Sequence, residues 1–134
     1  MTPFHLKIVT PDGLLFDGQA EELIVRTTGG DVAILARHIN YVAPLGMGRA
    51  VVVTGGERRT AACIGGMLSV VDGEVTLVPT TFEWSDKIDL SRAERAYEKA
   101  EKMLKDSGAS NTDIQLAEAK LHRALVRKSV ASYK

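Results

Sequence analysis

This sequence has little of several things that whole classes of protein require. One cysteine, Cys63, among 134 residues excludes a disulfide framework and a multi-cysteine metal site. Aromatic residues make up 5% of the chain, so a core has to be built from aliphatic side chains. No apolar run reaches the roughly 18 residues that a membrane-spanning helix needs. The formal net charge is zero, which argues against the broad basic surface of a protein that binds nucleic acid.

Two segments of different composition meet near residues 84–86. Residues 1–86 hold eleven of the twelve glycines, all four prolines and a net charge of −4. Residues 87–134 hold one glycine, no proline and a net charge of +4. We therefore expect one domain over residues 1–86 and a second over residues 87–134.

The first segment has the pattern of short β-strands. In residues 4–9 and 21–27, apolar and polar side chains alternate, as in a strand with one buried face. Further strands are expected at residues 14–16, 32–35, 49–54, 60–64, 67–71 and 74–78. Turns at Gly55-Gly56, Gly65-Gly66 and Asp72-Gly73 separate the later strands. This spacing predicts an antiparallel β-sandwich or barrel, with Cys63 as a core residue.

The second segment has the pattern of two helices. Ser91 with Glu94 and Thr112 with Gln115 have the form of capping boxes, and each begins an Ala-rich run. A linker of a few residues around Gly108 makes these helices an antiparallel hairpin. Their shared faces are mostly alanine, which removes little apolar area from water, so we expect marginal stability. The predicted fold class is α+β, an N-terminal antiparallel β-sandwich or barrel followed by a C-terminal antiparallel two-helix hairpin.

Positive side chains gather in the helical segment. Arg92 and Lys99 are two turns apart on the first helix, and Arg123 and Arg127 are one turn apart on the second. In an antiparallel hairpin these cations can converge on a phosphate chain, which arginine grips with two hydrogen bonds. The competing interpretation is a solvated surface paired with carboxylates at Glu94, Glu98, Glu101 and Glu118. The spacing by itself favours that second interpretation.

No catalytic constellation stands out in the chain. His5, His38 and His122 are too far apart in sequence to form a metal-ligand spacing, and no nucleophile is followed by a matching base. We therefore expect neither a metal site nor a catalytic site. Two functions remain compatible with the residues. One is a free-standing β-sandwich binding module with a helical dimerisation tail, and the other is a small hydrolase whose residues converge from distant loops.

Six short segments in order along the chain match the motifs of one known family. They are IVTPDG at 8–13, Ile34-Leu35 with His38, VAPL at 42–45, GGMLSV at 65–70, VTLV at 75–78 and Ile-Asp-x-x-Arg-Ala at 88–93. Together with the two-helix tail they resemble the epsilon subunits of bacterial F-type ATP synthases. The resemblance implies a non-catalytic subunit of the rotating central stalk, peripheral to the cytoplasmic side of the cell membrane. Its implied partners are the gamma subunit, the c-ring and, through an extended inhibitory tail, the beta subunits.

The resemblance also implies two sets of site residues. Contacts with the gamma subunit and the c-ring are expected at Gly29, Gly30, Asp31 and His38. In some members the Ile-Asp-x-x-Arg-Ala motif forms a regulatory ATP site that keeps the hairpin folded, and no other cofactor is implied. Carried over by position, that site comprises Glu83, Ile88, Asp89, Arg92, Ala93, Lys99, Arg123 and Arg127. Lys99 replaces an arginine, which exchanges a planar two-bond grip for a point charge and should weaken the site.

One loop departs from the family pattern. Where many members read Gly-Ile-Leu-Pro-Gly-His-x-Pro-Leu, residues 33–41 read Ala-Ile-Leu-Ala-Arg-His-Ile-Asn-Tyr. Loss of the glycines and proline changes the backbone of the loop. We therefore expect the contacts of His38 and of the turn at 29–31 to differ in detail from the family pattern.

Overall fold

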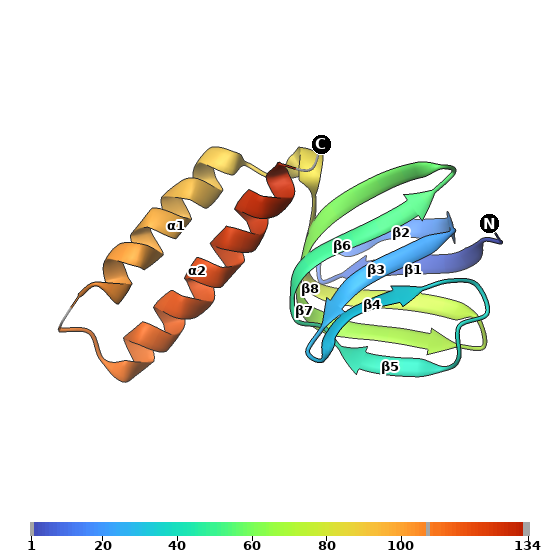
Figure 1. Ribbon diagram of the computed structural model, residues 1–134, viewed down its shortest axis with the longest axis horizontal. Coiled ribbons are helices and arrows are strands. Elements are labelled where there is room, and N and C mark those ends of the chain that lie inside the picture. The colour runs from blue at the N-terminus through green and yellow to red at the C-terminus, as the bar shows by residue number, and fades with distance from the viewer. Residues whose placement is uncertain (1, 107, 133–134) are drawn as a thin grey trace. The chain divides into compact units, whose positions relative to one another are not determined.

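The computed structural model describes residues 2–106 and 108–132, which form one unit up to Trp84 and another from Ser85 onward. The first unit consists of strands (Figure 1): β1 (Phe4–Thr10), β2 (Gly13–Ala20), β3 (Glu22–Thr27), β4 (Gly30–Ile34), β5 (Tyr41–Pro44), β6 (Met47–Thr54), β7 (Glu57–Val71) and β8 (Glu74–Trp84). The second contains a short 3₁₀ turn, η1 (Ser85–Lys87), and the helices α1 (Leu90–Leu104) and α2 (Asn111–Ala131).

The strands form one hydrogen-bonded path, β2-β1-β8-β7-β6-β3-β4, with β5 paired to β7. This path folds over into two layers, and the apolar side chains between them form the core of the predicted sandwich (Figure 1). Among the described strands, neighbours run antiparallel except β1 and β8, which run parallel from Leu6 opposite Val75. The sequence did not reveal this pair, because alternation along a strand identifies its buried face but not its neighbour.

The residues around Gly65-Gly66 form one long strand, where the sequence predicts two. β7 runs through both glycines, pairing with β6 as far as Ile64 and with β5 from Met67 onward. Gly66 has a φ of +102°, and a Cβ at this position would overlap the carbonyl oxygen of Val78. The glycines are therefore a bend where the strand changes partners, and the expected turn between two strands is wrong.

The core of the sandwich is mainly aliphatic, as the small number of aromatic residues requires. Phe82 and Trp84 pack edge to face with ring centroids 4.9 Å apart, and the guanidinium of Arg59 lies 3.7 Å from the centroid of Trp84. Cys63 belongs to the core, as predicted, and burial raises the pKa of its thiol to about 12. The thiol is thus protonated at neutral pH and unsuited to act as a nucleophile.

Both helices begin two residues earlier than expected. Asp89 is the N-cap of α1, and Ser110 forms a capping box with Asp113 at the start of α2. The capping boxes expected at Ser91 and Thr112 are therefore wrong. Asp and Ser are equally good N-caps, so several candidates close together in sequence compete for each helix start.

The buried face of α1 is made of alanine, as predicted. Ala93 and Ala100 are its buried residues, and Ala117 and Ala124 are buried at the same seven-residue spacing on α2. Alanine contributes little apolar area, so the packing of these alanines stabilises the hairpin only modestly. Near its C-terminal end α2 also buries Val126 and Val130. Within the described residues, neither helix is both long enough and apolar enough to cross a membrane.

Candidate functional site

A groove of about 220 Å³ lies between α1 and α2. Three of the four cations predicted to converge line it, Lys99 from α1 and Arg123 and Arg127 from α2. The lining is completed by Ala96, Ala100, Met103 and Lys120. The sequence analysis missed Lys120, although it stands three residues before Arg123, a spacing that places both on one side of a helix.

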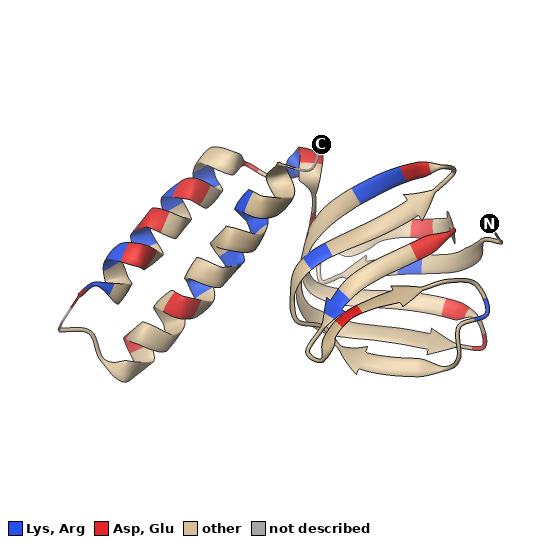
Figure 2. Cartoon of the chain, in the orientation of Figure 1, with Lys and Arg blue, Asp and Glu red and all other residues tan. Residues whose placement is uncertain are grey.

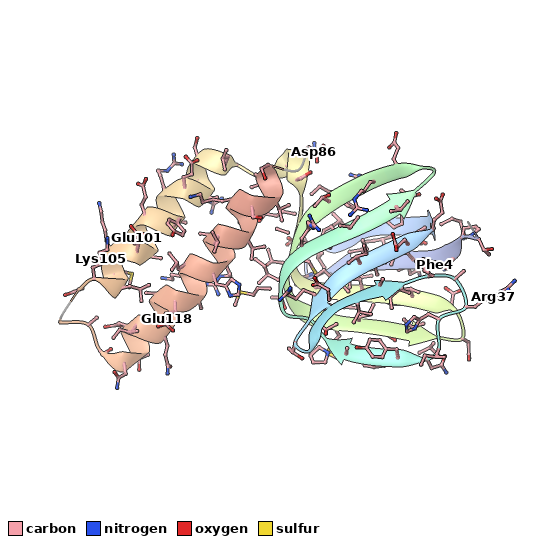
Figure 3. The ribbon with its side chains drawn as sticks, in the orientation of Figure 1. Phe4, Arg37, Asp86, Glu101, Lys105 and Glu118 are labelled. Carbon is pink, nitrogen blue, oxygen red and sulfur yellow. The ribbon has the colours of Figure 1, made fainter. Side chains whose placement is uncertain are left out.

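The carboxylates of α1 lie away from this groove. At about 100° per residue, Glu94 and Glu101 lie roughly opposite Lys99 on the helix, and Glu98 lies about 100° from Lys99, on the side away from Ala100. Glu101 pairs with Lys105 at 3.6 Å, and both side chains project from α1 away from α2 (Figure 3). This ion pair therefore leaves the charge of the groove unchanged.

The second half of α2 carries positive charge alone. After Glu118 no acidic residue follows in the chain, and Figure 2 shows this stretch of the helix in blue and tan without red. The described residues that line the groove include four cations and no carboxylate. Three of the four cations that the sequence spacing could bring together therefore line one groove, as the convergent interpretation requires.

The motif at the start of α1 is largely engaged in holding the helix. The carboxylate of Asp89 accepts the backbone N–H of Arg92 at 3.0 Å, and Ala93 is 4% exposed. Arg92 stands two turns before Lys99 and is not among the described residues that line the groove. Of the remaining expected site residues, half-buried Ile88 lies ahead of the helix and Glu83 lies in β8 of the other unit.

The turn at residues 29–31 is held by its own side chains. Thr27 Oγ1 accepts the backbone N–H of Gly29 at 3.1 Å and donates to the carbonyl oxygen of Gly30 at 2.8 Å. Arg26 donates to both carboxylate oxygens of Asp31, with Nε at 3.0 Å and Nη2 at 3.4 Å. The turn is therefore stiff, and the negative charge of Asp31 is partly compensated.

His38 lies in the loop after β4, at the opposite end of that strand from the turn at 29–31. Its ring meets Tyr41 edge-on with centroids 5.8 Å apart, and its Nδ1 donates to the carbonyl oxygen of Ile39 at 2.8 Å. The preceding residue, Arg37, has a φ of +64° at the position where the family pattern has glycine. The structure thus separates His38 from the other three expected contact residues by the length of β4.

An exposed apolar patch covers the outer face of β5, β7 and β8. Val42, Met67, Val71 and Val78 are 61%, 43%, 49% and 44% exposed, and Met67 stands directly opposite Val78 in the sheet. We call these four residues the outer apolar patch. Sequence reasoning missed it, although apolar residues on the solvent side of the strand alternation signal such a surface.

Comparisons with known proteins place both units in one family. The family of ATP synthase delta/epsilon chains matches with its beta-sandwich domain over residues 3–85 and its long alpha-helix domain over residues 86–132. The ATP synthase epsilon chain of Ruminococcus albus is 43% identical, covering 100% of both chains, and that of Halalkalibacterium halodurans is 37% identical, covering 98% of both. A chain in the solved mitochondrial ATP synthase of Euglena gracilis shares the fold, with a TM-score of 0.84 and 21% identity over 100% of this chain and 83% of that one. The chain therefore belongs to the epsilon-chain family of ATP synthase.

Proposed function

We propose that this chain is a rotor subunit of a bacterial F-type ATP synthase, where it couples rotation of the membrane-embedded c-ring to the catalytic head. The observation that carries the proposal is the end-to-end match to an ATP synthase epsilon chain at 43% identity. Epsilon chains are non-catalytic, so ATP synthesis and ion transport belong to the complex. Family membership favours this function over a free-standing binding module or a hydrolase. We expect the chain on the cytoplasmic side of the cell membrane, attached peripherally through the complex.

Two surfaces of the strand unit support docking on the gamma subunit and the c-ring. The outer apolar patch presents four exposed aliphatic side chains on one face, which is typical of a protein contact surface. The turn at residues 29–31 and the loop with His38 stand at the two ends of β4 and so can meet different partners. The turn is stiffened by the Arg26–Asp31 pair, so it loses little conformational entropy on binding.

Recovery of the tagged chain from mildly solubilised native membranes tests this docking. The chain should bring down gamma and c subunits at low salt. Met67→Glu places a charge within the outer apolar patch and should reduce recovery of the gamma subunit about tenfold. Leu116→Glu, at a leucine of α2 that is 52% exposed against 43% for Met67, is the matched control and should leave recovery unchanged. If the native chain recovers no rotor subunit, the proposal fails.

The helical tail is the part of the chain that restrains ATP hydrolysis, by extending toward the beta subunits. The alanine-lined packing between α1 and α2 supports this role, because opening the hairpin exposes little apolar area. The net charge of +4 in residues 87–134 suits an acidic partner surface. A chain ending at Lys87 keeps all of β8 and should raise hydrolysis by the assembled complex several-fold. An unchanged rate of ATP hydrolysis would show that the tail does not inhibit the complex.

Regulatory ATP holds the hairpin compact by binding in the groove between α1 and α2, which is lined by Lys99, Lys120, Arg123 and Arg127. A ligand that binds only the compact form shifts the balance toward it in proportion to its concentration over its Kd. Titration of the isolated chain with ATP should show binding that Arg123→Ala and Lys99→Ala, both in the groove, weaken. Lys105→Ala, on the far side of α1, should leave binding intact. Equal binding by all four proteins, or none by any, would eliminate the nucleotide-sensing role.

A further inference from the structure

We infer that His5 makes docking at the outer apolar patch depend on pH, because its ring holds the carboxylates of both Asp17 and Glu74 only while it is protonated. The inference rests on the docking of that patch on the gamma subunit proposed above, and it adds a regulatory residue to the same surface. None of these three residues belongs to the six motifs on which the family resemblance was based.

The three side chains lie next to one another on one face of the sheet. His5 stands on β1, which has β2 on one side and β8 on the other. Its Nε2 lies 2.5 Å from Oδ1 of Asp17 on β2, and its Nδ1 lies 2.5 Å from Oε2 of Glu74 on β8. One imidazole ring therefore connects three neighbouring strands through their side chains.

This row of side chains reaches the outer apolar patch through Glu74. Glu74 stands directly opposite Val71, one of the four residues of the patch, and residues paired in this way have Cβ atoms about 5 Å apart. The side chain of Glu74 is 64% exposed, and Val71 is 49% exposed. A partner that covers Val71 therefore also removes water from the carboxylate of Glu74.

Protonated His5 can satisfy both carboxylates, and neutral His5 cannot. Ionised carboxylates only accept hydrogen bonds, so each one requires an N–H of the ring, and a neutral ring has a single N–H. The hydrogen bonds to Asp17 and to Glu74 raise the pKa of His5 above 6.5, so the ring keeps its second proton to a higher pH than a free histidine does. Loss of this proton changes the three groups from one net negative charge to two.

The other groups around His5 make Glu74 the carboxylate that loses its compensation. Lys7, the other charged residue of β1, stands opposite Asp17, and His5 and, more weakly, Lys7 lower the pKa of the Asp17 carboxyl. The residue opposite His5 on β2 is the neutral Gln19. Within the part of the chain that the structure describes, His5 is the one cation paired with Glu74. Deprotonation of His5 therefore leaves an uncompensated carboxylate at the edge of the patch.

Docking should become weaker as the pH rises. Burial of a carboxylate without a hydrogen-bonded cation costs more free energy than burial of a paired one. Docking therefore favours the protonated ring and takes up a proton, and the affinity falls as pH rises through the folded-state pKa of His5. Well below 6.5 the ring is protonated before docking, so there the affinity should no longer change with pH.

Isothermal titration of the full chain into catalytic heads that contain the gamma subunit but lack this chain tests the inference. The Kd of the native chain should rise about tenfold between pH 6 and pH 9. Titrations in buffers of different ionisation enthalpy should show uptake of a proton on docking near the middle of this range.

Variants assign the pH dependence to one ring. His5→Gln cannot be protonated, so its Kd should equal the native value at pH 9 and should stay there at pH 6. Glu74→Gln removes the carboxylate next to the patch and should dock at pH 9 about as tightly as the native chain at pH 6, which keeps the inference testable if His5→Gln does not fold. His122→Gln, at an exposed histidine of α2, is the matched control and should follow the native curve.

The outcomes separate this inference from the proposal on which it rests. Docking with the same Kd at pH 6 and pH 9 would overturn the role of His5 and leave docking on the gamma subunit standing. A pH dependence that His5→Gln or Glu74→Gln retains in full would do the same. Absence of docking at every pH would overturn both the inference and the proposed contact.

Discussion

Arg37 occupies a backbone conformation that residues with a Cβ usually avoid. Its φ of +64° lies in the left-handed region, where such residues are disfavoured by roughly 1–2 kcal/mol. The side chain extends from the loop after β4 (Figure 3). The same loop holds the exposed residues Leu35 and Ile39. The loop therefore keeps the geometry of a glycine position although the glycine itself has been replaced.

Replacing this residue should stabilise the sandwich. Arg37→Gly removes the Cβ strain and should raise the free energy of unfolding by about 0.5–1 kcal/mol in urea denaturation. Arg37→Ala removes the guanidinium but keeps the Cβ, so it should give no such gain. An equal rise in the free energy of unfolding in both variants would show that the strain comes from the guanidinium side chain and not from the backbone conformation.

His5 connects the two neighbours of β1 through its ring. Nε2 lies 2.5 Å from Oδ1 of Asp17 on β2, and Nδ1 lies 2.5 Å from Oε2 of Glu74 on β8. Ionised carboxylates only accept hydrogen bonds, so both ring nitrogens must carry protons for both bonds to form. The hydrogen bonds to Asp17 and Glu74 raise the pKa of His5 above 6.5, and the bond from His5 lowers the pKa of Asp17 below 3.8.

The stability that this contact contributes should depend on pH. Because the folded-state pKa of His5 is raised, its contribution is complete below 6.5 and is lost as pH rises through the folded value. The contribution of Asp17 is lost at the acid end, as pH falls through its lowered pKa. His5→Gln should therefore lower the Tm at pH 5.5 more than at pH 9. A deficit independent of pH would contradict this assignment.

At the scale of the element, β7 depends on one glycine. Gly66→Ala drives a Cβ into the backbone of β8 at Val78, which cannot yield as a side chain would. We expect a loss of about 3 kcal/mol or more in the free energy of unfolding. Gly56→Ala is the matched control, since Gly56 has a φ of +79° but no atom within 4 Å of an added Cβ, and should cost about 1 kcal/mol. Similar costs in both would contradict the close approach at Gly66.

Short sequence signals, such as glycine-rich turns, predicted which strands and helices exist better than where each one begins and ends. The turns at Gly55-Gly56 and Asp72-Gly73 are confirmed, with positive φ at all four residues, because a tight hairpin turn imposes that geometry locally. The same kind of signal failed at Gly65-Gly66. There the glycines are required because the backbone of β8 passes close to Gly66. The sequence next to Gly65-Gly66 carries no sign of that close approach.

At the scale of the whole molecule, the strand unit has a core of its own. Every residue of the hydrophobic core cluster lies at or before Trp84. A chain ending at Lys87 should therefore unfold cooperatively, with a midpoint within a few degrees of the strand transition in the full chain, as followed by the fluorescence of Trp84. A fall of more than about 10 °C would show that the helices are needed for the sandwich.

Only part of the candidate site could be predicted from the sequence. Helical spacing and an antiparallel hairpin were sufficient to bring Lys99, Arg123 and Arg127 to one groove. The roles assigned to Asp89 and Ala93 depended on where α1 begins and which side it buries, and the structure engages both in holding the helix. Lys120 was missed because its place in the groove depends on which residues of α1 lie beside it.

The sequence by itself determined the two segments, the aliphatic sandwich and the alanine-lined hairpin, since these follow from composition and from periodicity along the chain. It also indicated the family, through the resemblance of six short motifs. Tertiary structure alone decided the parallel pairing of β1 with β8, the unbroken course of β7, the outer apolar patch and the place of Lys120 in the groove. The physical reason is that alternation and helical period report which side of an element is buried. Which other element meets that side is fixed by packing between residues far apart in the chain.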